Sequence, residues 1–277
     1  MYLLRRVPVF FEQPVGGDGR ITLSNGTRPA GGHTQNGRGY AAGAVIPAEP
    51  WREPSPAERD LLLTDSLPTG PANWIAVISV PDAAVTGLRH FPPQSNLPAS
   101  CIEALLLSLS PYIVSRSSIR VHCITTNPPG LLTGTIAEPD GVYLGLHLDS
   151  WDRLSFPENS RARNRVCINL GTTDRSFLFL NLTLADMLAA TGSSVDAIRR
   201  AGASDVGRAI GRLFLERFPD YPVVKLRVRP DEAYVAPTEN LLHDASTADM
   251  TSEDVQLTLR GHFRIPGQDA RRGGSVC

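Results

Sequence analysis

Residues 141–151 read GVYLGLHLDSW, a short run in which two kinds of side chain alternate. Successive side chains of a β-strand point to opposite faces, so the alternation predicts a strand with one face in the core. That core face carries Val142 and three leucines. The opposite face carries Tyr143, Gly145, His147, Asp149 and Trp151. This second face places an imidazole beside a carboxylate, and we expect Gly145 to leave space next to them.

A second histidine completes a set of possible metal ligands. His243 lies 96 residues after His147, behind an extended segment and before the last predicted strand. Two histidines and one carboxylate bind a divalent metal and leave coordination positions open for other ligands. Glu239 and Asp244 flank His243, which also leaves open that His243 belongs to a surface turn.

The last predicted strand, DVQLTLRGHFRI at residues 254–265, adds a cation. Alternation places Arg260 on the same face as Gln256 and Thr258, turned toward a polar interior. Arg260 follows His243 by 17 residues. A guanidinium at this point is suited to a two-pronged hydrogen bond with a dicarboxylate.

The order of HLD, a distal His and an Arg on the last strand resembles that of the iron(II)/2-oxoglutarate-dependent oxygenases. The resemblance covers about residues 120–265. It implies a mainly β protein with helical additions, folded as a cupin-like double-stranded β-helix, or jelly roll. It also implies that iron(II) is bound by His147, Asp149 and His243, and that Arg260 binds the far carboxylate of the cosubstrate 2-oxoglutarate.

One departure from the family pattern concerns the cosubstrate. The family often has Ser or Thr two residues after the arginine, whereas this chain has His262 there and Thr258 two residues before. Arg165 and Arg175, with Asn169 between them, are therefore alternative anchors for 2-oxoglutarate or for a substrate. Related halogenases replace the ligand carboxylate with a small residue. Because Asp149 is kept, the resemblance implies hydroxylation or desaturation.

Composition narrows the partners. The 277 residues carry a formal net charge of −1, without the basic surplus typical of nucleic-acid or anionic-lipid binding. We therefore expect no nucleic acid and no membrane, but O₂ and a small polar substrate such as an amino acid or a natural-product intermediate. Four cysteines without a CxxC pair, and no long apolar run, predict a cytoplasmic protein. The composition is also compatible with a homo-oligomer.

The pattern of elements predicts one catalytic domain over residues 71–277, with a helical insertion at about 183–218. Residues 1–70 are loop-rich and form an extension that is a candidate cover for the active site. Within the domain, Ser100 and Glu103 have the spacing of a capping box at the start of a helix. The runs 164–171 and 176–184, joined by TTDR, predict a hairpin.

Two other functions fit the same residues. The first is a jelly-roll metalloenzyme that does not use 2-oxoglutarate and acts as an isomerase or hydrolase. The second is a non-enzymatic binding module in which His147 and Asp149 only bond each other. His122 and Cys167 have no ligand-spaced partner, so they are expected to be structural.

Overall fold

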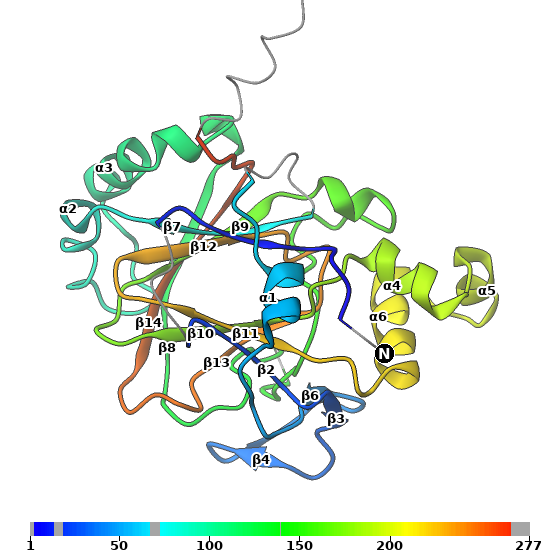
Figure 1. Ribbon diagram of the computed structural model, residues 1–277. Coiled ribbons are helices and arrows are strands. Elements are labelled where there is room, and N and C mark those ends of the chain that lie inside the picture. Colours follow the sequence, from blue (N-terminus) through cyan, green and yellow to red (C-terminus); the bar gives the residue numbers. More distant parts are fainter. Residues whose placement is uncertain (1–2, 14–18, 67–72, 139, 267–277) are drawn as a thin grey trace, which may run out of the picture.

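The computed structural model describes residues 3–13, 19–66, 73–138 and 140–266, and its main feature is a pair of facing sheets (Figure 1). The larger sheet has the order β1–β7–β12–β9–β14–β8 and the smaller one the order β13–β10–β11–β2. The larger contains β1 (Val9–Phe11), β7 (Ile75–Ser79), β12 (Glu232–Ala236), β9 (Asn164–Asn169), β14 (Asp254–Gly261) and β8 (Arg120–Asn127). The smaller contains β13 (His243–Ser246), β10 (Arg175–Phe179), β11 (Val224–Val228) and β2 (Ile21–Leu23).

The course of the chain between these sheets defines the fold. After β8 and β9 in the larger sheet, the chain forms β10 and β11 in the smaller one, then returns to β12, crosses to β13 and ends in β14. An isolated bridge joins His147 to His243, which places His147 beside β13. The order β8–β14–β9–β12 thus faces the order His147, β13, β10 and β11. This winding confirms the predicted double-stranded β-helix.

Two apolar layers hold the sheets in place. One lies between them, where the rings of Phe177 and Tyr234 stack at 4.0 Å. The other lies between the larger sheet and the helices α2 (Asp82–Val85) and α3 (Ala99–Ser108). Side chains therefore leave the larger sheet alternately toward the helices and toward the interior, as Leu257 and Leu259 do on the helix side.

The helical insertion predicted at about 183–218 is confirmed. It consists of α4 (Leu184–Thr191), α5 (Val195–Arg200) and α6 (Val206–Arg217), which lie together at one end of the molecule (Figure 1). Thr183 forms a capping box with Asp186 at the start of α4, and Asp205 caps α6. The remaining helices are α1 (Pro56–Leu62) and the short 3-10 turns η1 (Ser110–Tyr112), η2 (Arg116–Ser118) and η3 (Glu158–Arg161).

Two local predictions are wrong. The runs around TTDR do not pair as a hairpin, because β9 and β10 belong to different sheets. The Asn169 side chain fixes this crossing by donating to Thr173 O at 2.9 Å and accepting from Gly171 N at 2.9 Å. In α3, Ser100 is a helical residue and not a cap. The N-cap is Pro98 and no side chain caps the helix.

The N-terminal segment is built into the fold. Strand β1 pairs in parallel with β7, and β2 pairs with β11, so each sheet receives one strand from it. Two small hairpins follow, β3 (Thr27–Pro29) with β6 (Val45–Pro47), and β4 (Thr34–Gln35) with β5 (Arg38–Gly39). The predicted boundary near residue 70 lies outside the described residues, and the division into extension and catalytic domain stays a prediction.

The prediction of a strand over residues 141–151 is wrong, because this run is irregular and makes only isolated bridges, at Tyr143 and His147. Gly145 has φ +70°, which breaks the alternation, and Leu146 N donates to Val45 O at 2.8 Å. A Cβ at Gly145 would lie 2.5 Å from Val45 O. The absence of a side chain at Gly145 therefore allows the backbone of Val45, in the N-terminal segment, to pack against it. The prediction that Gly145 clears space beside the predicted metal ligands is therefore wrong.

Replacing Gly145 by alanine is expected to destabilise the fold. The left-handed backbone alone costs a residue with a Cβ about 1–2 kcal/mol, and the contact with Val45 adds to that cost. The control is Gly141→Ala, because Gly141 also has a positive φ but its Cβ would meet only the Arg38 guanidinium, at 3.2 Å. Urea unfolding measures both. Equal losses in the two variants would contradict the role given to the Val45 contact.

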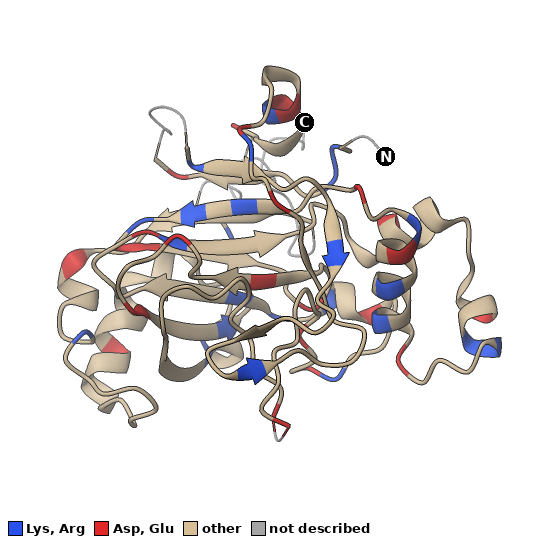
Figure 2. Cartoon of the chain, turned by 90° about the horizontal axis from the view of Figure 1, so that it is seen from below, with Lys and Arg blue, Asp and Glu red and all other residues tan. Residues whose placement is uncertain are grey.

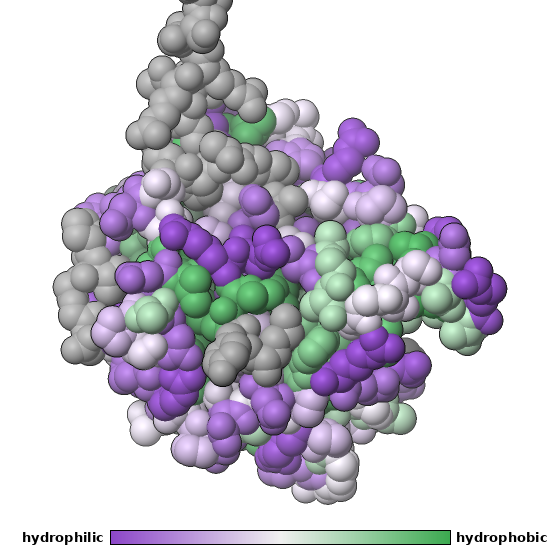
Figure 3. All heavy atoms as spheres, turned by 45° about the vertical axis from the view of Figure 1, so that its right-hand side comes forward, coloured by the Kyte–Doolittle hydropathy of each residue, from purple (hydrophilic) through white to green (hydrophobic). Residues whose placement is uncertain are grey.

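Charged residues of both signs are mixed along the chain (Figure 2), and the face seen in Figure 3 has both polar and apolar residues. Seen from below, basic and acidic residues are interspersed along strands and helices (Figure 2). The face that carries the α4–α6 end mixes green apolar and purple polar residues (Figure 3). Within the described residues, no helix has the length and apolarity needed to cross a bilayer.

Candidate metal centre

The structure brings the three predicted ligands together. One nitrogen each of His147 and His243 and one oxygen of Asp149 lie within 4.8 Å of one another. Asp149 Oδ1 is 3.9 Å from His147 Nε2, and Asp149 Oδ2 is 3.6 Å from His243 Nε2. The alternative of a surface turn at His243 is wrong, because His243 is only 1% exposed.

Backbone hydrogen bonds set the spacing of the two histidines. His147 N donates to His243 O at 3.0 Å, and His243 N donates to His147 O at 2.9 Å. The two residues are thus directly opposite each other across neighbouring strands, with ring centroids 4.7 Å apart. Asp149 N donates to Thr238 O at 3.1 Å, which holds the carboxylate end of the run against the segment before β13.

The hydrogen bonds of the two rings leave the same nitrogen available on each. His147 Nδ1 lies 2.8 Å from Gly145 O, and His243 Nδ1 lies 3.3 Å from Leu241 O. A carbonyl can only accept, so Nδ1 carries the proton and Nε2 keeps its lone pair. Within the described chain, both Nε2 atoms are buried and have no hydrogen-bond partner. Two such orphaned acceptors beside a carboxylate are what a divalent metal requires.

The electrostatics of the site favour the metal-binding forms of His243 and Asp149. Burial would lower the pKa of His147, but Asp244 and Asp149 raise that pKa overall. Burial lowers the pKa of His243 to about 4, so this imidazole is neutral at neutral pH. Burial would raise the pKa of Asp149, but His243 and Arg165 hold that pKa well below its usual range. Asp149 therefore stays a carboxylate although its side chain is 8% exposed.

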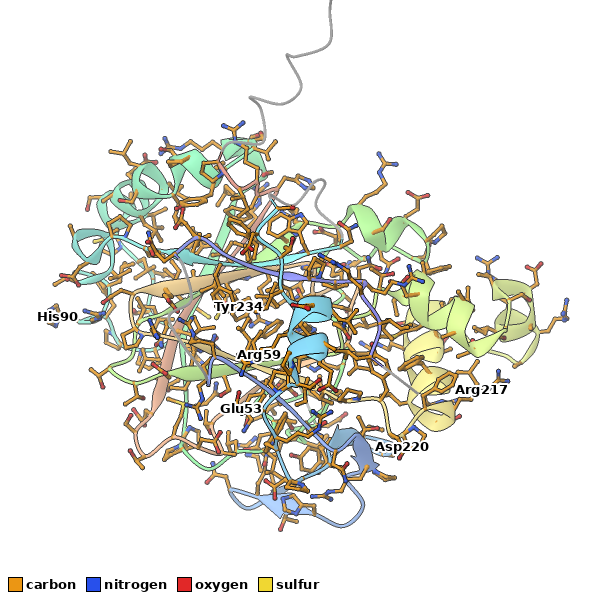
Figure 4. The ribbon with its side chains drawn as sticks, viewed as in Figure 1. Glu53, Arg59, His90, Arg217, Asp220 and Tyr234 are labelled. Atoms are coloured by element: carbon orange, nitrogen blue, oxygen red, sulfur yellow. The ribbon has the colours of Figure 1, made fainter. Side chains whose placement is uncertain are left out.

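A polar cavity of about 160 Å³ adjoins His243 inside the β-helix. Arg165 on β9 and Tyr234 on β12 line it, and Tyr234 lies between the two sheets (Figure 4). Arg165 Nη1 is 3.4 Å from Asp149 Oδ2, and its buried Nε has no partner among the described residues. Gln256, Thr125 and Thr135 are further polar residues of the wall. The cavity offers a cation and hydroxyl groups next to the metal ligands.

The other two candidate arginines are paired with carboxylates more closely than Arg165 is with Asp149. Arg260 does face the interior as predicted, but its Nη2 donates to Asp152 Oδ1 at 2.6 Å and to Glu239 Oε1 at 2.8 Å. Arg175 binds Asp254 with two nitrogens, at 2.8 and 3.2 Å, and both side chains are 1% exposed. Neither arginine lines the 160 Å³ cavity.

The remaining predicted cosubstrate residues are not part of the cavity wall. Asn169 uses its side chain on backbone groups, including Val228 O at 2.9 Å. Thr258 is buried on the interior face of β14, opposite Cys167. Sequence reasoning missed Tyr234 and Asp244. The alternation in EAYVA could have indicated Tyr234, because Ala233 and Val235 face the helix side of the sheet.

Another edge of the site carries His122 and Trp151. The register of β8 against β14 shifts between Val121 and Ile124, so His122 and Cys123 together lie opposite Thr258, as in a β-bulge. Bulges often redirect a side chain beside an active site. The His122 ring contacts Trp151 edge-on at 4.3 Å, and Arg260 lies over the indole at 5.1 Å. Trp151 is 46% exposed, so the pair forms an open aromatic wall.

Comparison with known proteins gives little beyond this geometry. No family model matches the sequence, and no curated protein matches it. The chain is similar to crystal structures of the Kdo hydroxylase KdoO, a non-heme Fe(II) alphaketoglutarate dependent dioxygenase. The cobalt(II) complex has 16% identity and a TM-score of 0.35, covering 59% of each chain. The complex with alphaketoglutarate and Fe(III) has 15% identity and a TM-score of 0.35, covering 59% of this chain and 60% of that one. The likeness thus extends over about three fifths of either protein.

Proposed function

We propose that this chain is an Fe(II)- and 2-oxoglutarate-dependent oxygenase that hydroxylates a C–H bond of a small polar substrate. The observation that carries the proposal is the pair of buried, unpartnered Nε2 atoms of His147 and His243 beside the Asp149 carboxylate. Two imidazoles and one carboxylate with open positions are diagnostic of non-haem Fe(II) oxygenases. The bound iron would supply the site at which O₂ is activated.

For the cosubstrate we propose the 160 Å³ cavity, with Arg165 as its cationic partner. Arg165 supports this role because its buried Nε has no partner among the described residues. Its carboxylate contact among these residues, with Asp149, is 3.4 Å long, whereas Arg260 and Arg175 each contact carboxylates at 3.2 Å or less. Burial would lower the pKa of Arg165, but Tyr234 and Asp149 raise that pKa overall, so the guanidinium stays protonated. The neutral Tyr234 hydroxyl, whose pKa is raised by burial, lines the same wall.

For the substrate we propose the side of the site with His122 and Trp151. Burial, with Arg260 and Arg165 nearby, lowers the pKa of His122, which is therefore a neutral imidazole. Its Nε2 is excluded from solvent and has no partner in the described chain. A polar group of the substrate could bond this nitrogen while a flat or ring-shaped part stacks on the exposed indole.

Anaerobic titration with Fe(II) and then 2-oxoglutarate tests the proposed function. A visible charge-transfer band that appears only with both is expected. Folded protein that binds Fe(II) but gives no band with 2-oxoglutarate would instead favour the metalloenzyme without this cosubstrate. Folded protein that binds no Fe(II) would favour the third function, a non-enzymatic binding module. Release of succinate under air, measured with candidate substrates, then identifies the substrate.

Arg165→Ala is expected to weaken 2-oxoglutarate binding. A hydrogen bond to a charged group contributes about 1.5–3 kcal/mol, which corresponds to roughly a 10- to 150-fold rise in the dissociation constant. The band gives this constant directly. Arg161→Ala is the control, because that side chain is 81% exposed. If Arg260→Ala loses the charge-transfer band and Arg165→Ala retains it, then Arg260, and not Arg165, binds 2-oxoglutarate.

A further inference from the structure

Asp244 follows the proposed ligand His243 and carries a buried carboxylate. Among the described residues, one of its oxygens accepts several hydrogen bonds and the other accepts none. Its side chain is 0% exposed. Oδ1 accepts from Gly134 N at 3.2 Å, Thr135 N at 3.1 Å, Thr135 Oγ1 at 2.8 Å and Ala245 N at 2.7 Å. Oδ2 accepts from no donor in the described chain. A buried carboxylate oxygen without a donor is costly, so a fold that keeps one needs a reason.

The position of the second oxygen of Asp244 suggests why the fold keeps it. Asp244 Oδ2 lies 3.6 Å from His147 Nδ1, the nitrogen that carries the ring proton. That distance is too long for a hydrogen bond, and the proton goes to Gly145 O at 2.8 Å. A metal on Nε2 would withdraw electrons from the ring and make the Nδ1 proton a stronger donor. A second acceptor at that position then becomes favourable.

We propose that Asp244 is the positioning residue of the metal centre. In the metal-bound state its Oδ2 shares the Nδ1 proton of His147 with the Gly145 carbonyl. The carboxylate thereby fixes the ring orientation and increases the electron donation of Nε2 to the metal. This inference rests on the metal site of the proposed function and deepens it.

The same residue connects the metal to the wall of the cosubstrate cavity. The 134–135 backbone that holds Oδ1 lines the 160 Å³ cavity together with His243. That backbone is in turn held by the N-terminal segment, since Gln35 Nε2 donates to Thr133 O at 2.6 Å and Gln35 Oε1 accepts from Leu132 N at 2.9 Å. Asp244 therefore fixes His147 relative to the cavity, and not only relative to its own strand.

The test is Co(II) binding by Asp244→Asn, without cosubstrate or turnover. The Asn carbonyl can replace Oδ1 at the 134–135 amides, but its NH₂ group then faces the Nδ1 proton of His147, donor against donor. We expect Co(II) affinity to fall by about 10- to 100-fold, as for other partners of metal-bound histidines. Asp249→Asn is the matched control, because Asp249 lies just after β13, is 52% exposed and pairs with Lys225. Its affinity should equal that of the unmodified chain.

The outcomes separate this inference from the proposed function. If the unmodified chain binds no Co(II), the metal centre itself is wrong. If it binds Co(II) and Asp244→Asn binds equally well, the centre stands and the role of Asp244 is overturned. An Oδ2 satisfied by water alone would give this second result.

A second measurement covers a variant that does not fold. In the unmodified protein, the carbon-13 resonance of the Asp244 side-chain carboxylate should shift when Zn(II) is added, because Oδ2 then accepts the Nδ1 proton of His147. An Asp244 carboxylate resonance that is the same with and without Zn(II) would contradict the proposal. Thermal unfolding of metal-free Asp244→Asn, compared with the unmodified chain, reports any general loss of stability separately.

Discussion

Replacing His243 by alanine should abolish stoichiometric Fe(II) binding. Among the described residues, three side chains form the candidate metal site, and His243 contributes one of its two buried Nε2 atoms that have no hydrogen-bond partner there. Changes to residues that merely support a ligand cost about 10- to 100-fold in affinity, so the loss of a ligand should exceed that range. Anaerobic Fe(II) titration, followed by metal analysis of the desalted protein, measures it.

The control for this variant is His90→Ala. His90 is exposed and lies at the periphery of the molecule, far from the centre in the side-chain view (Figure 4). That variant should bind one Fe(II) as the unmodified chain does. Retention of a full equivalent of iron by both His243→Ala and His147→Ala would mean that the metal is bound elsewhere.

Removing Asp254 should produce the largest loss of stability. Asp254 neutralises Arg175 through two hydrogen bonds, and both side chains are 1% exposed. Asp254→Ala leaves the guanidinium charged and buried, because Arg175 keeps its proton under all ordinary conditions. Loss of one partner of a buried ion pair costs about 3–5 kcal/mol in the free energy of unfolding. Urea unfolding, with the midpoint and slope determined separately, measures this.

Two further variants show whether burial is the cause. Glu216→Ala breaks the exposed Arg212–Glu216 pair on α6, whose side chains are 74% and 63% exposed. It should cost no more than about 0.5 kcal/mol. The double variant Arg175→Met with Asp254→Leu removes both charges and should recover much of the loss. A double variant as unstable as Asp254→Ala would show that the pair matters through packing instead of charge.

Local sequence patterns were sufficient to predict much of the fold. Alternation identified β14 and its interior face, and helical spacing within 183–218 identified the region of α4 and α6 but not α5. These patterns depend on neighbouring residues only, and such signals are written into the chain itself. The TTDR hairpin failed for the same reason. A turn sequence specifies a reversal of direction, but the sheet that the next strand joins depends on packing elsewhere.

The candidate ligand set also came from the sequence, because its residue types and order suffice to suggest the metal. The choice among the candidate anchors did not. Arg165, Arg175 and Arg260 are equivalent as residues, and only the fold places Asp152 and Glu239 beside Arg260 and Asp254 beside Arg175. These carboxylates lie between 21 and 108 residues from their arginines. Pairing at such separations is invisible to local patterns.

The sequence by itself thus determined a jelly-roll chain with two histidines and an aspartate suited to one metal. Only the tertiary structure decided which nitrogen of each ring is available and which arginine has a buried nitrogen without a partner among the described residues. It also decided that Asp244 turns toward His147 an oxygen that accepts from no donor in the described chain. The physical reason is that coordination, hydrogen bonding and charge neutralisation act over a few ångströms in space. Residues far apart in the chain reach such distances only after the sheets have folded.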